Sequence, residues 1–287
     1  MTRCRWSPCM VAVLLVNAAL SVTLVAQQPD SSEKSPPAFS TGVTAGAIRF
    51  SGGRSEQGVG AIFQYQPRTW LTLSVTPGFA QTRLGDTSSS GLTDIPLSAG
   101  VSYQWGDASW SPSLSGSLTA TISSSGSSTG VGLGRGTLGG YAAFGVSPTD
   151  VLNFVVGASQ PLSANSGNGS IDIEGGLELT RASVTAGFSN EVGTADSGAV
   201  LARSVAVGVS FPLAGRLRLA VDGSSGLTTG APSWTFSIGI GTAFGGHSPL
   251  NPNSALRRLK KVFGAKVAST SGFNGKGTGS CKKAGTC

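Results

Sequence analysis

Between Ala108 and Ser123, apolar and hydroxyl-bearing residues alternate almost without interruption. The apolar parity carries Trp110, Pro112, Leu114, Gly116, Leu118, Ala120 and Ile122, and the hydroxyl parity carries Ser111, Ser113, Ser115, Ser117, Thr119, Thr121 and Ser123. Successive side chains of a strand point to opposite faces, so this pattern predicts a strand with one apolar and one hydroxyl-lined face. A helix repeats its apolar positions every three to four residues and does not fit. The segment exceeds the usual ~5–6 residues of a strand and suits a membrane-crossing strand of about 9–11.

The same alternation recurs along the chain and predicts twelve strands. They lie near residues 40–51, 59–65, 71–79, 95–105, 108–123, 138–146, 152–158, 171–179, 184–189, 204–211, 216–222 and 234–244. Tight turns near residues 67–68, 106–107, 147–150, 181 and 214–215 alternate with longer Gly/Ser-rich connections at 51–55, 83–91, 123–133, 163–169, 192–198 and 223–232. Outer-membrane barrels alternate in this way, with short periplasmic turns and longer outer loops. An even strand count then places both termini in the periplasm.

Aromatic residues gather near the predicted strand ends. They are Trp70, Trp105, Trp110, Trp234, Phe211 and Phe244. Such a girdle is typical of barrels whose aromatic side chains lie at the two membrane–water interfaces. A soluble β-sandwich also alternates, but it more often buries its Trp in the middle of a strand. Strand length, loop rhythm and the girdle together favour an all-β, closed, antiparallel up-and-down transmembrane barrel.

The first 26 residues have the features of a secretory signal peptide. Arg3 and Arg5 precede an apolar stretch over residues 10–26 that ends in the small residue Ala26. An uncleaved inner-membrane anchor is the alternative, and the short, Ala-rich core argues against it. No later stretch reaches the ~20 consecutive apolar residues of a spanning helix, so only a closed barrel could enter a membrane. We therefore divide the chain into a signal peptide (1–26), a lead segment (27–39), a barrel (40–246) and a basic tail (247–287).

The formal net charge of +7 is unevenly distributed. Residues 27–246 carry ten basic and thirteen acidic side chains, whereas residues 247–287 carry eight basic and no acidic ones. Within this tail, residues 254–268 fit a short helix with Ser254 as its N-cap and one apolar stripe. The tail could contact an anionic periplasmic partner, lie on the inner leaflet of the outer membrane, or extend into solvent. We expect no nucleic acid partner in this compartment.

The cysteines divide between the two ends of the chain. Cys4 and Cys9 leave with the signal peptide, whereas Cys281 and Cys287 remain in the tail. In an oxidising periplasm the tail pair could form a small-loop disulfide. Two thiolates without a nearby His supply too few ligands for a metal site, so we expect no metal.

Two stretches resemble a known group of proteins. Residues 69–77 read TWLTLSVTP and residues 91–103 read GLTDIPLSAGVSY. These segments are similar to the paired strands of the phenol-degradation meta-pathway (MetA-like) outer-membrane barrels, over about residues 40–244. The L-P-T-G usual in that group at the end of the next strand is absent, and the chain reads ISSSG at residues 122–126. The resemblance implies outer-membrane transport of small, often hydrophobic compounds and identifies no substrate.

Two short motifs with catalytic associations lack the context that their chemistry needs. Residues 126–130 match G-x-S-x-G, but that motif requires a strand–turn–helix and a His partner, and the single His of the chain, His247, follows the last predicted strand. Residues 134–139 match G-x-G-x-x-G but open a strand rather than a helix, so they cannot cradle a phosphate. We therefore expect no enzyme and no cofactor.

Charged residues fall on the face opposite the apolar one in several predicted strands. The candidates for the lumen wall are Asp172, Glu174, Glu178, Glu191, Arg216, Arg218 and Asp222. An Arg on the lipid face at mid-membrane would cost ~2–4 kcal/mol, which favours the lumen for this face. The wall could orient polar solutes in a transverse field, or its charges could be internal ion pairs that fill a narrow barrel. Arg203 falls on the lipid parity near the outer rim, where it could reach lipopolysaccharide phosphates.

These features predict an outer-membrane barrel, in a Gram-negative type of envelope, that passes or binds a small molecule through its lumen. A structural or adhesive barrel with a plugged lumen is the first alternative, and an outer-membrane hydrolase is a remote one. The expected surroundings are outer-membrane lipid and lipopolysaccharide. The sequence leaves open which solute passes and whether the lumen is open.

Overall fold

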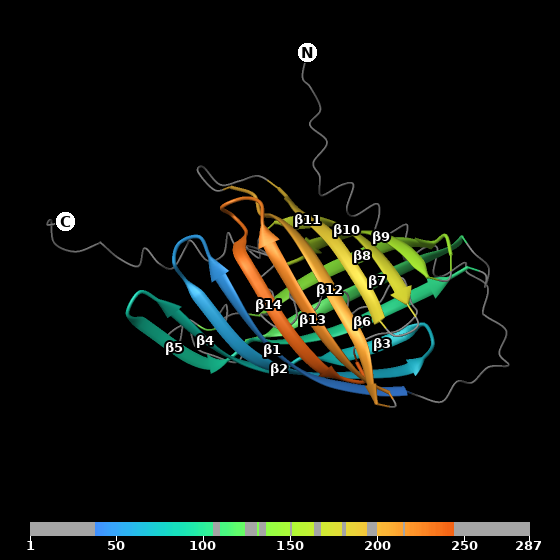
Figure 1. Cartoon of the computed structure of the whole chain (residues 1–287), viewed down its shortest axis with the longest axis horizontal. Helices are drawn as coiled ribbons and strands as arrows, with labels where there is room; N and C mark the ends of the chain where they lie inside the picture. Colours follow the sequence, from blue (N-terminus) through green and yellow to red (C-terminus); the bar gives the residue numbers. More distant parts are fainter. Residues whose placement is uncertain are drawn as a thin grey trace, which may run out of the picture.

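The computed structural model describes residues 38–105, 110–123, 131, 136–149, 151–163, 168–179, 182–193, 200–214 and 216–243. Within them the chain forms one antiparallel sheet of fourteen strands (Figure 1). The strands are β1 (Ala38–Phe50), β2 (Ser55–Arg68), β3 (Leu71–Val75), β4 (Gly78–Leu84), β5 (Thr87–Leu92), β6 (Ile95–Gln104), β7 (Ser111–Ile122), β8 (Thr137–Ser147), β9 (Leu152–Pro161), β10 (Gly169–Leu179), β11 (Ala182–Val192), β12 (Arg203–Ala214), β13 (Leu217–Gly226) and β14 (Pro232–Gly241). The predicted signal peptide, the lead segment up to residue 37 and the basic tail lie outside the described residues.

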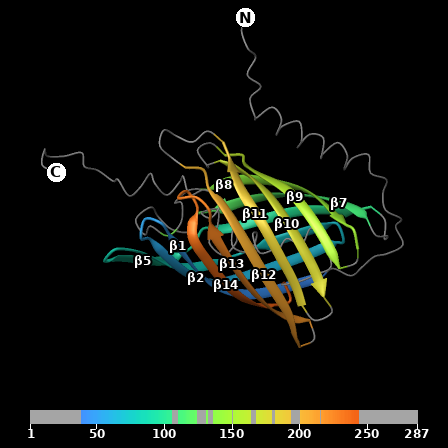
Figure 2. The same ribbon diagram turned by 45° about the horizontal axis from the view of Figure 1, so that its top comes forward.

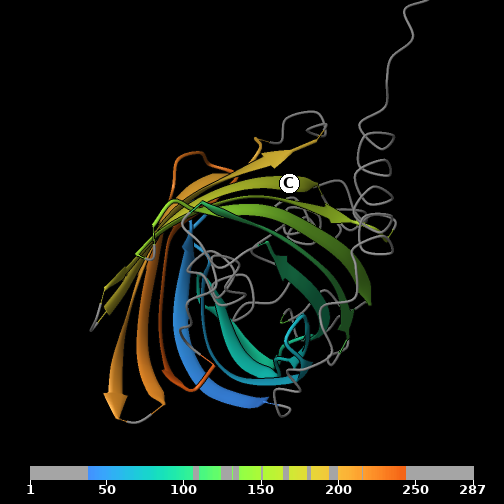
Figure 3. The same ribbon diagram turned by 90° about the vertical axis from the view of Figure 1, so that its right-hand side faces the viewer.

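The sheet closes on itself because the first strand pairs with the last. β1 pairs with β2 on one side and with β14 on the other, from Gly42 opposite Gly241 to Phe50 opposite Pro232. The view in Figure 3 shows the resulting ring of strands around a central lumen. The predicted closed antiparallel barrel is confirmed.

Two of the twelve wall positions are each built from two short strands. β3 and β4 both pair with β2 and together form the third position. β5 pairs with β4 and β6 pairs with β3, so these two form the fourth. Pro77 lies at the first interruption and Pro96 is the second residue of β6, next to the second interruption; a proline cannot donate a ladder hydrogen bond. The prediction of twelve wall strands is therefore correct, and the two interruptions raise the number of separate strands to fourteen.

The predicted long connection at residues 83–91 is wrong. Most of it is strand, because β4 continues to Leu84 and β5 begins at Thr87, with Arg83 opposite Ser88. Only Gly85 and Asp86 remain in the turn, and Gly85 adopts a φ of 59°, which a glycine tolerates without strain. Figures 1 and 2 show this hairpin extending beyond its neighbours at one end of the barrel. The strand was not predicted because the Ser/Thr-rich sequence of β5 has no apolar alternation.

The outer face of the barrel is apolar and the inner face is largely polar. In β14, for example, Trp234, Phe236 and Ile238 are 42–46% exposed, whereas Thr235 and Ser237 are at most 3% exposed. Soluble proteins rarely expose contiguous apolar surface of this extent, whereas a lipid-facing barrel wall requires it. The outer face is therefore the membrane-contacting surface.

No helix among the described residues has the length and hydrophobicity to cross a membrane.

The two ends of the barrel differ in their connections. The turn end carries the connections β2–β3, β6–β7, β8–β9, β10–β11 and β12–β13, together with the two ends of the described barrel, Ala38 and Ala243. The loop end carries the connections β1–β2, β4–β5, β7–β8, β9–β10, β11–β12 and β13–β14, whereas β3–β4 and β5–β6 join within the wall. These names are used below for the two rims.

A small apolar cluster lies on the lumen side of the wall near the turn end. Ile62, Ala220 and Ala243 pack together and are at most 2% exposed. Glycines on β1 and β14 lie between them, because Gly42 is opposite Ile62 and Gly239 is opposite Ala220. After β14 the chain bends inward, and the N–H groups of Thr242 and Ala243 both donate to the Thr41 carbonyl oxygen, at 2.7 and 3.1 Å. The chain therefore leaves β14 toward the lumen.

Candidate functional site

The inner wall of β10 and β11 carries four acidic side chains, three of them among the six buried acids of the described residues. Asp172, Glu174 and Glu178 share the inward parity of β10, and Glu191 lies inward near the loop end of β11. Asp172 and Glu191 are 3% and 4% exposed, and Glu174 is 9% exposed. Their outward neighbours on β10, such as Ile171 and Ile173, are half exposed. The alternation along these two strands thus separates an acidic lumen surface from an apolar lipid surface.

Hydroxyl groups on adjacent strands hold the lumen carboxylates. In each case the Ser or Thr donates to a carboxylate at the directly opposite position of the neighbouring strand. The pairs are Ser189 to Asp172 at 2.5 Å, Ser237 to Asp222 at 3.3 Å and Thr82 to Glu56 at 3.3 Å. Residues opposite one another in a sheet bring their side chains within contact distance. The register of the barrel therefore fixes the direction of these carboxylates.

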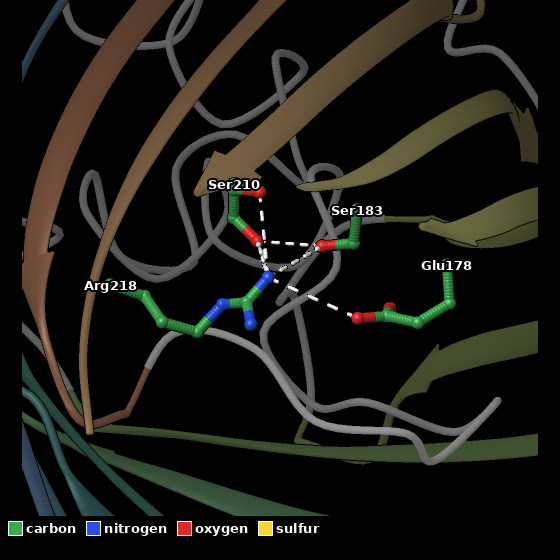
Figure 4. A network of polar contacts seen from close by, with 4 residues as sticks. All are labelled: Glu178, Ser183, Ser210 and Arg218. Carbon is green, nitrogen blue, oxygen red and sulfur yellow. Dashed lines mark hydrogen bonds and ion pairs between the residues drawn. The ribbon is translucent and has the colours of Figure 1, made fainter. Parts of the chain in front are cut away.

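Arg218 links three strands of the wall near the turn end (Figure 4). Its Nη2 donates to Ser210 Oγ at 3.1 Å and to Ser183 Oγ at 3.5 Å, and these two hydroxyls are 2.6 Å apart. The same nitrogen lies 3.9 Å from Glu178 Oε1 on β10. Both charged side chains keep about a fifth of their surface exposed, at 22% and 17%. A cation and an anion thus face the lumen side by side at this level.

The structure separates the two arginines that the sequence placed together. Arg218 lies on β13 and faces inward, whereas Arg216 is exposed in the turn that precedes this strand. The parity argument extended the strand two residues too far, because the turn after β12 already includes Arg216. Arg216 therefore does not line the lumen.

Arg203 also lies where the parity placed it, on the outer face. Its side chain is exposed near the loop end of β12, and its Nε donates to Asn190 Oδ1 on β11 at 2.9 Å.

The aromatic candidates lie at the rims, as far as the structure describes them. Trp70, Trp105, Trp110 and Phe211 are 38–69% exposed near the turn end, and Trp234 is 43% exposed near the loop end. Tyr103 packs edge-on against Trp105, with ring centroids 5.0 Å apart. Three candidates lie outside the described residues: Phe244, Cys281 and Cys287.

One charged pair was not predicted as part of the lumen. Arg54, in the turn after β1, lies 2.6 Å from Glu56 Oε1 and 5.8 Å above the Phe50 ring. Burial lowers the pKa of the Arg54 guanidinium from its ordinary value, and the adjacent Glu56 carboxylate opposes the shift. The parity of β2 could have revealed Glu56, since it lies on the side opposite Val59 and Phe63.

Asp94 is a second buried carboxylate that the sequence argument missed. It is 4% exposed at the interruption between β5 and β6, beside Thr93, which is 9% exposed. The side-chain parity shifts at this point, because Leu92 and Ile95 both fall on the outer side. A simple alternation cannot place a residue at such a shift.

The described residues form no group of three or more His, Cys, Asp or Glu side chains that could hold a metal ion. The lumen carboxylates are instead spread over β2, β10, β11 and β13, and Ser or Thr hydroxyls contact three of them. This arrangement can bind and orient polar or charged groups along the lumen. The motif at residues 126–130 and His247 lie outside the described residues, and of the motif at residues 134–139 only 136–139 are described.

Comparison with solved structures places the fold among outer-membrane barrels. The COG4313 outer membrane channel from Pseudomonas putida F1 matches over 75% of this chain and 98% of its own, with a TM-score of 0.54 and 15% sequence identity. The KdgM porin matches over 71% and 99%, with a TM-score of 0.47 and 10% identity. Outer membrane phospholipase A from Escherichia coli matches over 75% and 93%, with a TM-score of 0.40 and 12% identity. Only the first match has a TM-score above 0.5, so only this match bears on the present chain. Because its sequence identity is low, it bears on the fold alone.

No protein family matches the sequence, and no curated protein matches it. The resemblance to MetA-like barrels is therefore not established by either comparison.

Proposed function

We propose that this chain is an outer-membrane channel that passes or binds a small polar molecule through its lumen. The observation that carries the proposal is the wall formed by Glu174, Glu178 and Arg218, where opposite charges face one lumen. Paired charges of this kind orient dipolar solutes and set ion preference in narrow pores. In this proposal the turn end faces the periplasm, Arg203 contacts lipopolysaccharide phosphates, and the chain is a relative of the MetA-like barrels.

Planar-bilayer conductance tests the proposal, with Arg218→Gln and Arg216→Gln as a matched pair. Each variant removes one guanidinium, but only Arg218 faces the lumen. A unit charge about 10 Å from an ion in water contributes about 0.4 kcal/mol, which is about a twofold change in ion preference. We expect Arg218→Gln to shift the reversal potential toward greater cation preference by about that factor, and Arg216→Gln to leave it unchanged.

The Glu178→Gln and Glu174→Gln variants provide the opposite arm of the experiment. Loss of a lumen carboxylate is expected to shift the reversal potential toward anions. A folded, heat-resistant barrel that shows no conductance steps in wild type or in any variant contradicts the channel proposal.

A folded barrel without conductance would favour the second candidate, a structural or adhesive protein. The projecting Ser/Thr-rich hairpin of β4 and β5 supports this alternative, because it presents polar surface beyond the wall at the loop end. A hydrolase remains a remote candidate, to be tested by release of fatty acid from phospholipid.

A further inference from the structure

The last described residues after β14, Thr242 and Ala243, lead into the mouth of the barrel at the turn end. Ala243 is 2% exposed and packs against Ile62 and Ala220, whose side chains face the lumen. The two hydrogen bonds to the Thr41 carbonyl oxygen fix this inward bend. Ala243, the last described residue, therefore lies inside the mouth at the turn end, and 44 residues follow it in the sequence.

The lumen and the tail carry opposite charge. Among the described residues, six carboxylates occupy inward positions on β2, β10, β11 and β13. Two guanidinium groups oppose this negative charge, those of Arg218 on β13 and of Arg54 in the β1–β2 turn. The carboxylates are Glu56, Asp172, Glu174, Glu178, Glu191 and Asp222. The tail has eight Lys or Arg and no acidic residue. Surfaces of opposite charge that face each other attract and steer association.

Several buried lumen atoms have no hydrogen-bond partner among the described residues, and they include Glu191 Oε1, Ser113 Oγ, Ser115 Oγ and Arg218 Nε. Glu191 Oε2 accepts the Ala202 N–H at 2.7 Å, but Glu191 Oε1 accepts no hydrogen bond there. Ser113 Oγ, on a side chain that is 1% exposed, also has none. A buried carboxylate oxygen without a donor is costly, and an ammonium or guanidinium group satisfies it. Glu191 Oε1 therefore points to a cationic, hydrogen-bond-donating occupant, and Ser113 Oγ to a polar one.

The tail is long enough to reach every level of the lumen. β11 has 11 residues, so the wall is about 37 Å long at ~3.4 Å per residue along a strand. The fourteen residues that follow Ala243, up to and including Arg257, can span about 46 Å when extended. The cluster of Arg257, Arg258, Lys260 and Lys261 can therefore lie anywhere between the turn end and Glu191.

We propose that the basic tail, residues 247–287, docks in the acidic lumen of its own barrel and blocks passage through it. The proposal rests on the channel function proposed above and adds its regulation. Attraction between tail cations and lumen carboxylates holds the tail in place, so salt or a competing polyanion in the periplasm releases it.

Protection of the tail from trypsin tests docking without any need for conduction. The full chain is folded in a zwitterionic detergent, and cleavage after the tail Lys and Arg residues is followed at low salt and at about 1 M salt, where the Debye length is about 3 Å. When the tail undocks and redocks faster than trypsin cleaves it, the cleavage rate is proportional to the undocked population. Docking therefore predicts cleavage at least about tenfold slower at low salt than at high salt. The triple variant Glu174→Gln, Glu191→Gln, Asp222→Asn should lose this protection.

Asp86→Asn is the matched control, because it removes an exposed carboxylate from the β4–β5 turn outside the lumen. Its tail should stay protected. Rapid cleavage of the wild-type tail at low salt overturns the proposal. Protection that appears only after addition of phosphatidylglycerol vesicles also overturns it, and assigns the tail to an anionic lipid surface instead.

Conductance of two full-length chains separates this proposal from the channel function. The tail variant carries Arg257→Gln, Arg258→Gln, Lys260→Gln and Lys261→Gln. We expect it to conduct more than wild type at low salt and equally at about 1 M salt, where the tail charges are screened. Equal conductance at both salts contradicts blocking but supports a channel. If neither chain conducts, the channel function fails, and the trypsin experiment still decides whether the tail docks.

Discussion

At the scale of single residues, the lumen wall is organised by hydroxyl groups that meet across neighbouring strands. Besides the three carboxylates held by Ser or Thr, four hydroxyl pairs join directly opposite positions. They are Ser98–Thr119, Ser159–Ser170, Ser183–Ser210 and Ser224–Thr235, all at 2.6–2.8 Å. Each pair satisfies two polar groups that face the lumen interior. The frequent Ser and Thr on the inner parity thus hold the carboxylates and one another in fixed directions.

Ser189→Ala tests the strongest of these contacts. The substitution removes the hydroxyl that donates to Asp172, and a hydrogen bond to a charged group contributes about 1.5–3 kcal/mol. We expect the free energy of unfolding in urea, measured by tryptophan fluorescence in detergent or lipid, to fall by that amount. In an Asp172→Asn background the same substitution should have a smaller effect, and equal losses in both backgrounds would show that the contact does not stabilise the barrel.

At the scale of strands, the alternation predicted most elements because burial in lipid imposes it along each strand. β7 illustrates this success, since its Ser and Thr residues from Ser113 to Thr121 face inward as expected. The interruption at Thr76 and Pro77 was not predictable, because the inward and outward parity runs through it unchanged from Leu71 to Phe79. β5 was missed for the opposite reason, since it has no apolar alternation to detect.

Ile238→Arg tests the lipid-facing assignment of a strand interior. Ile238 lies in the middle of β14 and is 42% exposed, opposite Ala45 and Val221 on the same outer face. An Arg at mid-membrane costs ~2–4 kcal/mol, so we expect a loss of that size in unfolding experiments on barrels folded into phospholipid vesicles.

Leu217→Arg is the control for this prediction. Leu217 is the outward residue at the turn-end tip of β13, where a long side chain can reach the interface. Its loss of stability should be about 0–1 kcal/mol. Equal losses for both variants would mean that the outer face of β14 does not contact the hydrocarbon.

At the scale of the whole molecule, the sequence predicted which strands are charged but not which charges meet. The parity placed Glu178 and Arg218 on inner faces, yet their contact depends on the register of three intervening strand pairs. The inward bend at Ala243 was also beyond prediction, because it follows from hydrogen bonds to Thr41 on the first strand. Long-range pairing of this kind leaves no local pattern in the sequence.

Gly241→Ala tests the seam at which the barrel closes. A Cβ at Gly241 would lie 2.3 Å from both Gly42 Cα and the Thr41 carbonyl oxygen, so β1 and β14 would have to move apart. Overpacking of this kind costs about 1–3 kcal/mol, and the barrel should lose its compact form on a heat-modifiability gel at a lower temperature. Gly223→Ala is the control, because its Cβ would meet nothing closer than 3.7 Å. A matching melting temperature for both variants contradicts a tight seam.

The pairing of β1 with β14 also determines the order in which the molecule can assemble. Gly42 and Gly241 are partners although almost the whole barrel sequence separates them. Contacts between such distant segments form late, because the chain loses loop entropy before they stabilise it. Until then the growing sheet has two unpaired edges that can join a second chain. We expect the two terminal strands to limit the folding rate, and to be the part of the chain that most needs the protection of a chaperone before insertion.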